Sequence, residues 1–180
     1  MAQRQSLRDL QDRLAQRLTA AKTEAAGVSW LAVEAGGRQF LLPLVQSGEI
    51  FSWAPVQTVP YTQPWYVGVA ALRGGLHGVI DLAAFPGIGA QSASGARSDR
   101  LSAESRLISL HPALDVNAVL WVDKLLGLRN PAMFSALGER PENASAFVGR
   151  VLLDARGGVW QELDLQALAS DSVFLNITAE

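Results

Sequence analysis

A pattern of two apolar runs separated by a glycine pair occurs twice in this chain of 180 residues. Gly74–Leu82 aligns without a gap on Gly157–Leu165, and the runs before the glycines match as well, with two additional residues in the second copy. An apolar run, a turn that glycine permits and a second apolar run are typical of a β-hairpin. A duplicated unit of short strands predicts two related β-lobes, each a small barrel.

The first copy differs from the second at its turn. Arg73 precedes the Gly74–Gly75 pair, whereas Asp154–Ala155–Arg156 occupies this place in the second copy. An arginine beside a hairpin tip is often a solvated edge charge, which is one interpretation of Arg73. Because Arg73 has no counterpart in the second copy, function is expected at the first turn.

The segment 58–82 resembles the signature of the CheW-like coupling proteins of bacterial chemosensory systems. Its matching parts are the proline-rich approach 58–64, the step Gly68–Val69, the core Ala71–Leu72–Arg73–Gly74 and the closing strand Val79–Leu82. The sequence departs from the family's pattern at Ala71, where the family usually has Asn, and at Gly78, where it often has Pro. The resemblance extends more weakly over residues 28–170.

The resemblance implies an all-β fold of two pseudo-symmetric five-stranded SH3-like barrels packed together. It also implies a non-enzymatic adaptor that joins the cytoplasmic tip of a methyl-accepting chemoreceptor to the regulatory domain of a CheA-type histidine kinase. The receptor-binding residues expected from the family's motif lie in a groove between the barrels and are Leu72, Arg73 and Gly74, with Gly68 on the groove floor. Glu49 and Ile50 match the family's Glu-Ile and are expected to contribute to partner binding.

Three features are most similar to the couplers of type IV pilus systems within this family. They are the N-terminal helix, the segment Pro60–Trp65 and the Ala-Leu-Arg-Gly-Gly core. The resemblance therefore implies an output in twitching motility.

Periodicity and composition suggest how the chain is divided. Leucines at three- and four-residue steps predict an N-terminal amphipathic helix over 1–27, which either packs on its own domain or binds a partner. The remainder, 28–180, is expected to form the CheW-like domain, with a Gly/Ser/Ala-rich linker at about 86–105. Short helical turns are expected over 132–137 and 165–169.

The residues needed for enzymatic chemistry do not form a recognisable set. The chain has two histidines and no cysteine, and no spacing typical of a metal site, a phosphate loop or a nucleophile elbow. Asp81 and Asp164 occupy equivalent places in the two copies, which favours a structural role at strand ends. The sequence therefore predicts no catalytic residue, no metal site and no cofactor.

Charge and hydropathy restrict the partners further. A net charge of −2 argues against nucleic-acid binding. The first residues are too polar for a signal peptide, and no apolar run reaches the ~18 residues of a membrane span, so we expect a cytoplasmic protein without direct membrane insertion. The resemblance implies that its partners recruit it to membrane receptor arrays. The alternative function is a small-molecule-binding sensory module in which Trp53, Tyr61 and Trp65 line a pocket.

Overall fold

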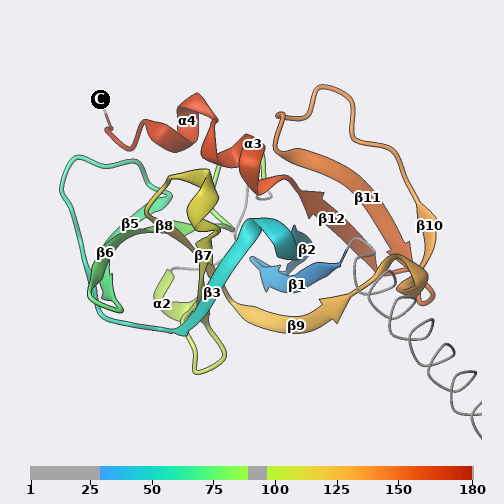
Figure 1. Cartoon of the computed structure of the whole chain (residues 1–180), viewed down its shortest axis with the longest axis horizontal. Helices are drawn as coiled ribbons and strands as arrows, with labels where there is room; N and C mark the ends of the chain where they lie inside the picture. The colour runs from blue at the N-terminus through green and yellow to red at the C-terminus, as the bar shows by residue number, and fades with distance from the viewer. Residues whose placement is uncertain (1–28, 89–96, 180) are drawn as a thin grey trace, which may run out of the picture.

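The computed structural model describes residues 29–88 and 97–179, and the N-terminal helix expected over 1–27 lies outside this part of the chain. The described residues form two six-stranded sheets that pack side by side (Figure 1). The first sheet has the strand order β10 (Phe134–Leu137), β11 (Val148–Asp154), β12 (Val159–Leu163), β2 (Arg38–Pro43), β1 (Trp30–Ala35) and β9 (Lys124–Arg129). The second has the order β3 (Ser47–Ser52), β7 (Arg106–Leu110), β8 (Ala118–Val122), β6 (Gly75–Asp81), β5 (Tyr66–Leu72) and β4 (Val56–Gln57).

The two sheets repeat one pairing pattern. In the second sheet β5 and β6 form an antiparallel hairpin, and β6 lies parallel to β8. In the first sheet β11 and β12 form the equivalent hairpin, and β12 lies parallel to β2. The all-β class and the two pseudo-symmetric lobes expected from the repeat are confirmed. Each sheet has six strands in place of the expected five, and its strand order has two ends and no closing pair.

The lobes do not correspond to the two halves of the sequence. The linker at 86–105 joins β6 to β7, and both strands belong to the second sheet. The first sheet combines β1 and β2 with β9–β12, because β12 pairs with β2. The two repeat hairpins lie on opposite sides of this linker in the sequence, but the linker itself lies within the second lobe.

Strand alternation divides the apolar side chains between three core clusters. On β8, Leu120 and Val122 face the largest cluster, which contains residues of both sheets, whereas Val119 and Trp121 face a cluster within the second lobe. Successive strand residues point to opposite faces, so a strand that is buried on both sides contributes to two clusters. A third cluster around Trp160 fills the first lobe. The large shared cluster holds the two sheets together.

Several short helical segments connect the strands. They are η1 (Leu44–Gln46), α2 (Arg97–Arg100), η2 (Pro112–Leu114), η3 (Pro131–Met133), α3 (Leu165–Ala169) and α4 (Ser172–Leu175). Asp164 caps α3, since its Oδ1 accepts hydrogen bonds from the N–H groups of Gln166 and Ala167, as the sequence predicts. The helical turn expected over 132–137 is wrong for the most part, because a single 3-10 turn precedes strand β10.

Asp81 has a structural role at the end of β6. Its side chain is buried, and its Oδ1 accepts a hydrogen bond from the N–H of Ala83. Arg100 lies with Nη2 2.6 Å from Asp81 Oδ1, and Arg97 with Nε 3.4 Å from Oδ2. A buried carboxylate needs such partners, because an isolated buried charge is costly. These ion pairs hold helix α2, which is the part of the linker that contains Arg97 and Arg100, against the end of β6.

Candidate partner-binding site

The hairpin tip between β5 and β6 consists of two residues, Arg73 and Gly74. Leu72 pairs with Gly75, so the turn lies one residue before the glycine pair that the sequence suggests. Both turn residues have positive φ, 46° at Arg73 and 77° at Gly74, which is the sign pattern of a type I′ turn. The right-handed twist of strands favours this turn, and it places the Arg73 side chain at the outermost point of the hairpin.

Arg73 forms an ion pair with Glu49 of β3. Its Nε lies 3.0 Å from Glu49 Oε2, and the two side chains are 76% and 51% exposed. The strands β3 and β5 are not neighbours in the sheet, so the pair joins the hairpin tip to an edge strand. The guanidinium is therefore paired with a carboxylate, while both side chains stay largely exposed. Glu49 is itself oriented by its backbone N–H, which donates to Ser109 Oγ at 2.8 Å.

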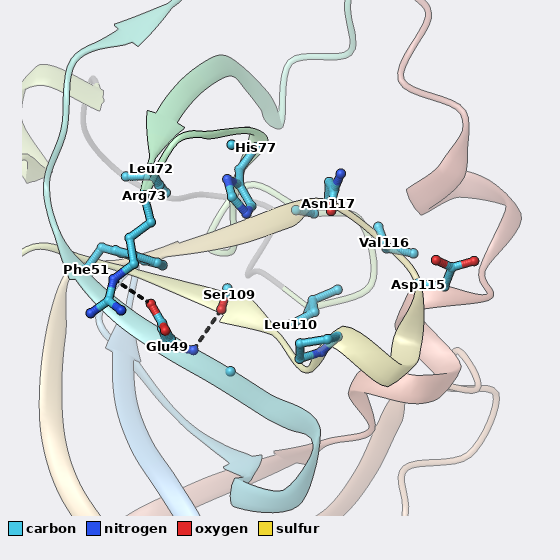
Figure 2. A pocket seen from close by; sticks show the side chains of 14 residues that line it. Glu49, Phe51, Leu72, Arg73, His77, Ser109, Leu110, Asp115, Val116 and Asn117 are labelled. Atoms are coloured by element: carbon cyan, nitrogen blue, oxygen red, sulfur yellow. Dashed lines mark hydrogen bonds and ion pairs between the residues drawn. The ribbon is translucent and has the colours of Figure 1, made fainter.

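A hollow of about 340 Å³ opens beside this ion pair. Figure 2 shows Arg73 and Glu49 at one end, Asp115 and Asn117 at the other, and His77 between them. Its lining comes from β3, β5, β6, β7, β8 and the connection between β7 and β8. The hollow thus belongs to the second lobe alone, whereas the expected groove lies between the two lobes.

The other residues predicted for the site fall at different places. Leu72 is buried in the core of the second lobe and reaches the wall of the hollow. Ile50 is exposed on β3 next to Glu49 and does not line the hollow. Gly68 lies near the opposite end of β5, where a side chain would collide with the backbone of Gln57 on β4. Its φ of +147° also favours glycine, so Gly68 has a structural role in seating β4.

Sequence reasoning missed the residues at the far end of the hollow. Asp115 ends η2 in the left-handed conformation, with φ 56°, and Asn117 follows two residues later. Both side chains are exposed, and neither has a hydrogen bond or ion pair within residues 29–88 and 97–179. The sequence does contain a signal for this turn, because Pro112 and Asp115 lie between two apolar runs. Asp tolerates the left-handed conformation better than most residues do.

The second copy of the hairpin has different chemistry at its turn. Asp154 Oδ2 accepts a hydrogen bond from Trp160 Nε1 at 3.0 Å, and its Oδ1 accepts from the backbone N–H groups of Arg156 and Gly158 at 2.8 Å each. The Trp160 hydrogen bond, followed by the two backbone bonds, lowers the pKa of Asp154 below its ordinary value. This carboxylate holds its own turn together, whereas Glu49 and Arg73 face solvent.

The aromatic residues considered for a small-molecule pocket do not come together. Trp65 is buried in the shared core, with its ring centroid 4.9 Å from that of Phe85. Trp53 packs on Trp121 with a centroid separation of 5.1 Å, and Tyr61 is 85% exposed. This arrangement gives no support to the alternative function.

Neither of the described ranges contains three His, Cys, Asp or Glu side chains grouped so that they can hold a metal ion. The helices in the same ranges are too short or too polar to cross a bilayer.

Comparisons with known proteins place this geometry in a family. The family model for the CheW-like domain matches residues 29–173. Protein PilI of Pseudomonas aeruginosa is 30% identical over 118 residues, which are 66% of this chain and 61% of PilI, so the match spans less than two thirds of that protein. The crystal structure of scaffolding protein TtCheW from Thermoanaerobacter tengcongensis has a TM-score of 0.57 and 18% identity, over 77% of this chain and 89% of that one. At this identity the TtCheW structure supports the fold alone.

Proposed function

Because the chain belongs to the family of CheW-like domains, we propose that it is a non-enzymatic adaptor of a chemosensory pathway. In this proposal it works in the cytoplasm and couples the tip of a transmembrane chemoreceptor to a CheA-type histidine kinase. The observation that carries the receptor side is the Arg73–Glu49 pair, which stands exposed at the rim of a hollow with apolar walls. A charged rim around an apolar centre is the usual anatomy of a protein–protein interface.

The size of the hollow favours a protein partner over a free small molecule. Its volume of about 340 Å³ is at the lower limit of ligand pockets, which measure about 300–1,000 Å³. Phe51, Leu72 and Leu110 provide apolar wall, and Arg73 stands on a projecting turn. A partner side chain that enters the hollow would bring its backbone close to Arg73 and Glu49.

An adaptor also needs a second surface that stays free when the first is bound. Ala136, Leu153 and Val159 are cross-strand neighbours on β10, β11 and β12, and all three are exposed. This apolar row lies on the first sheet, and the hollow lies in the second lobe. We propose that this row binds the kinase regulatory domain, since a row of uncharged side chains across three strands can offer apolar contact. Small interfaces of this kind gain strength when many adaptors assemble in one array.

The pathway we propose is the one that controls type IV pili. The identity of 30% to Protein PilI supports this narrower assignment. The output of the pathway would then be twitching motility.

Replacing Arg73 tests the receptor side of the proposal. Arg73→Ala is expected to leave the fold intact, because its ion pair is exposed, and to weaken binding of a receptor cytoplasmic fragment about tenfold, or ~1.4 kcal/mol. Arg156→Ala is the matched control, because Arg156 is an exposed arginine in the equivalent turn of the first lobe. Calorimetric titration of each variant measures the effect. Equal affinity of the wild type and a folded Arg73→Ala protein would remove Arg73 from the receptor site.

A further inference from the structure

One wall of the hollow is formed by a residue that differs between the two copies of the repeat. His77 of β6 aligns with Trp160 of β12 in the gap-free match of the two copies. Trp160 is 4% exposed and packs with Trp30 and Phe134 in the core of the first lobe. His77 is smaller and only partly buried, and it forms a wall of the hollow. At the aligned position the first lobe thus has a buried indole, and the second lobe has a smaller imidazole that borders the hollow.

The walls of the hollow include polar groups whose interactions are incomplete. His77 Nδ1 is inaccessible to solvent and has no hydrogen-bond partner within the described residues. Asp115 carries a negative charge at the far end without a counter-ion there, whereas Glu49 is paired with Arg73. The unpaired charge in the hollow is therefore negative, and it lies away from the ion pair.

We propose that the hollow accepts an apolar side chain from a helix of the receptor tip, and that Asp115 pairs with a lysine or arginine on the same helix. This inference rests on the proposed receptor-binding function and names the chemistry that the site recognises. Residues three or four positions apart lie on one face of a helix, so one helix can present both groups. Asn117 beside Asp115 adds an amide that can accept a further hydrogen bond from the cation.

The charge at Asp115 is tested by Asp115→Asn. Asn tolerates the left-handed conformation of this residue, so the turn is kept and only the charge is lost. Titration of the full chain with the cytoplasmic fragment of a chemoreceptor from the same organism is expected to show affinity weakened about fivefold, and a smaller dependence of affinity on salt. Glu142→Gln removes an exposed acidic charge from the first lobe and is expected to bind as the wild type does.

The cavity itself is tested by His77→Trp, which copies the residue of the first lobe into the second. Filling the hollow is expected to weaken fragment binding at least tenfold while Arg73 and Glu49 are unchanged. Thermal unfolding of the variant shows whether the indole is accommodated, and Asp115→Asn tests the proposal independently if it is not.

The outcomes separate this inference from the function on which it rests. If Arg73→Ala weakens binding but neither Asp115→Asn nor a folded His77→Trp does, the receptor binds at the turn and the inference about the hollow is wrong. If the wild type does not bind the fragment, the proposed function fails and the inference fails with it. Loss of affinity in both hollow variants, with Glu142→Gln unaffected, supports the inference.

Discussion

Arg73 and Glu49 are suited to binding more than to folding. An exposed ion pair contributes about 0–1 kcal/mol to stability, whereas a desolvated arginine at the centre of an interface can cost ~2 kcal/mol or more when it is truncated. Arg73 also has a left-handed conformation, which Asn or Gly would adopt with less strain, so arginine is not the residue that best stabilises this turn. The stability of the turn therefore does not explain the arginine at this place, whereas the proposed receptor contact does.

Asp154 has the opposite character, and its titration gives a prediction. Its pKa is lower in the folded protein than the value near 4 of an unfolded chain, chiefly because Trp160 donates a hydrogen bond to it. A depressed carboxyl pKa stabilises the fold above the unfolded pKa, and this stabilisation is lost as the pH falls through the folded pKa.

Asp154→Asn should therefore lower the Tm at pH 7, where the carboxylate is ionised in both states. The difference in Tm between the variant and the wild type should shrink as the pH falls below about 4. Thermal unfolding followed by circular dichroism from pH 7 to pH 3 measures this. A Tm difference that stays constant over this range would show that the charge of Asp154 has no part in stability.

At the level of elements, the sequence predicts best the strands that are buried on both faces. β1 and β8 are such strands, and their apolar runs are nearly continuous in the sequence. The half-exposed β11–β12 hairpin is indicated instead by the repeat. β9 and β10 were missed. They are edge strands with weak patterns, and Asn130–Pro131 before β10 is equally typical of an α-helix and of the 3-10 turn that forms there.

Pro43 shows how position within a strand decides the effect of proline. Proline within a strand usually marks an edge strand or a bulge, yet β2 lies between β12 and β1 in the sheet. Proline is tolerated because Pro43 is the last residue of β2, beyond Gln39–Leu41, which pair with β12. Because Pro43 does not pair with β12, its missing N–H removes no hydrogen bond between β2 and β12.

Gly68 gives a prediction for the β4–β5 pair. Gly68→Ala should destabilise the fold by about 2 kcal/mol, because a Cβ would collide with Gln57 and the positive φ disfavours any side chain. Gly157→Asn is the control, since Gly157 also has positive φ, at +79°, but open space around it, and Asn tolerates that conformation. Urea unfolding of both variants gives the free energies, and an equal small effect would show that β4 can move away without cost.

At the scale of the whole molecule, the repeat predicts two lobes but not which strands each contains. The parallel pairing of β12 with β2 joins segments more than a hundred residues apart, and nothing local in either strand specifies it. Because β1 and β2 belong to the first sheet, the hollow beside Arg73 is lined by the second lobe alone and does not lie between the two lobes. The motif therefore predicted Arg73 and Glu49 as part of the candidate site. It could not predict Asp115 and Asn117, because only the folded sheet brings the β7–β8 connection next to the turn.

The central claim is that two separate surfaces of one chain bind two partners at once. Size-exclusion chromatography with light scattering, on the full chain mixed with a receptor cytoplasmic fragment and a kinase regulatory domain, tests this directly. The account predicts a three-component complex, from which Arg73→Ala removes the receptor fragment alone and Leu153→Lys, on the exposed row, removes the kinase domain alone. Mutually exclusive binding of the two partners, or loss of both with either variant, would contradict it.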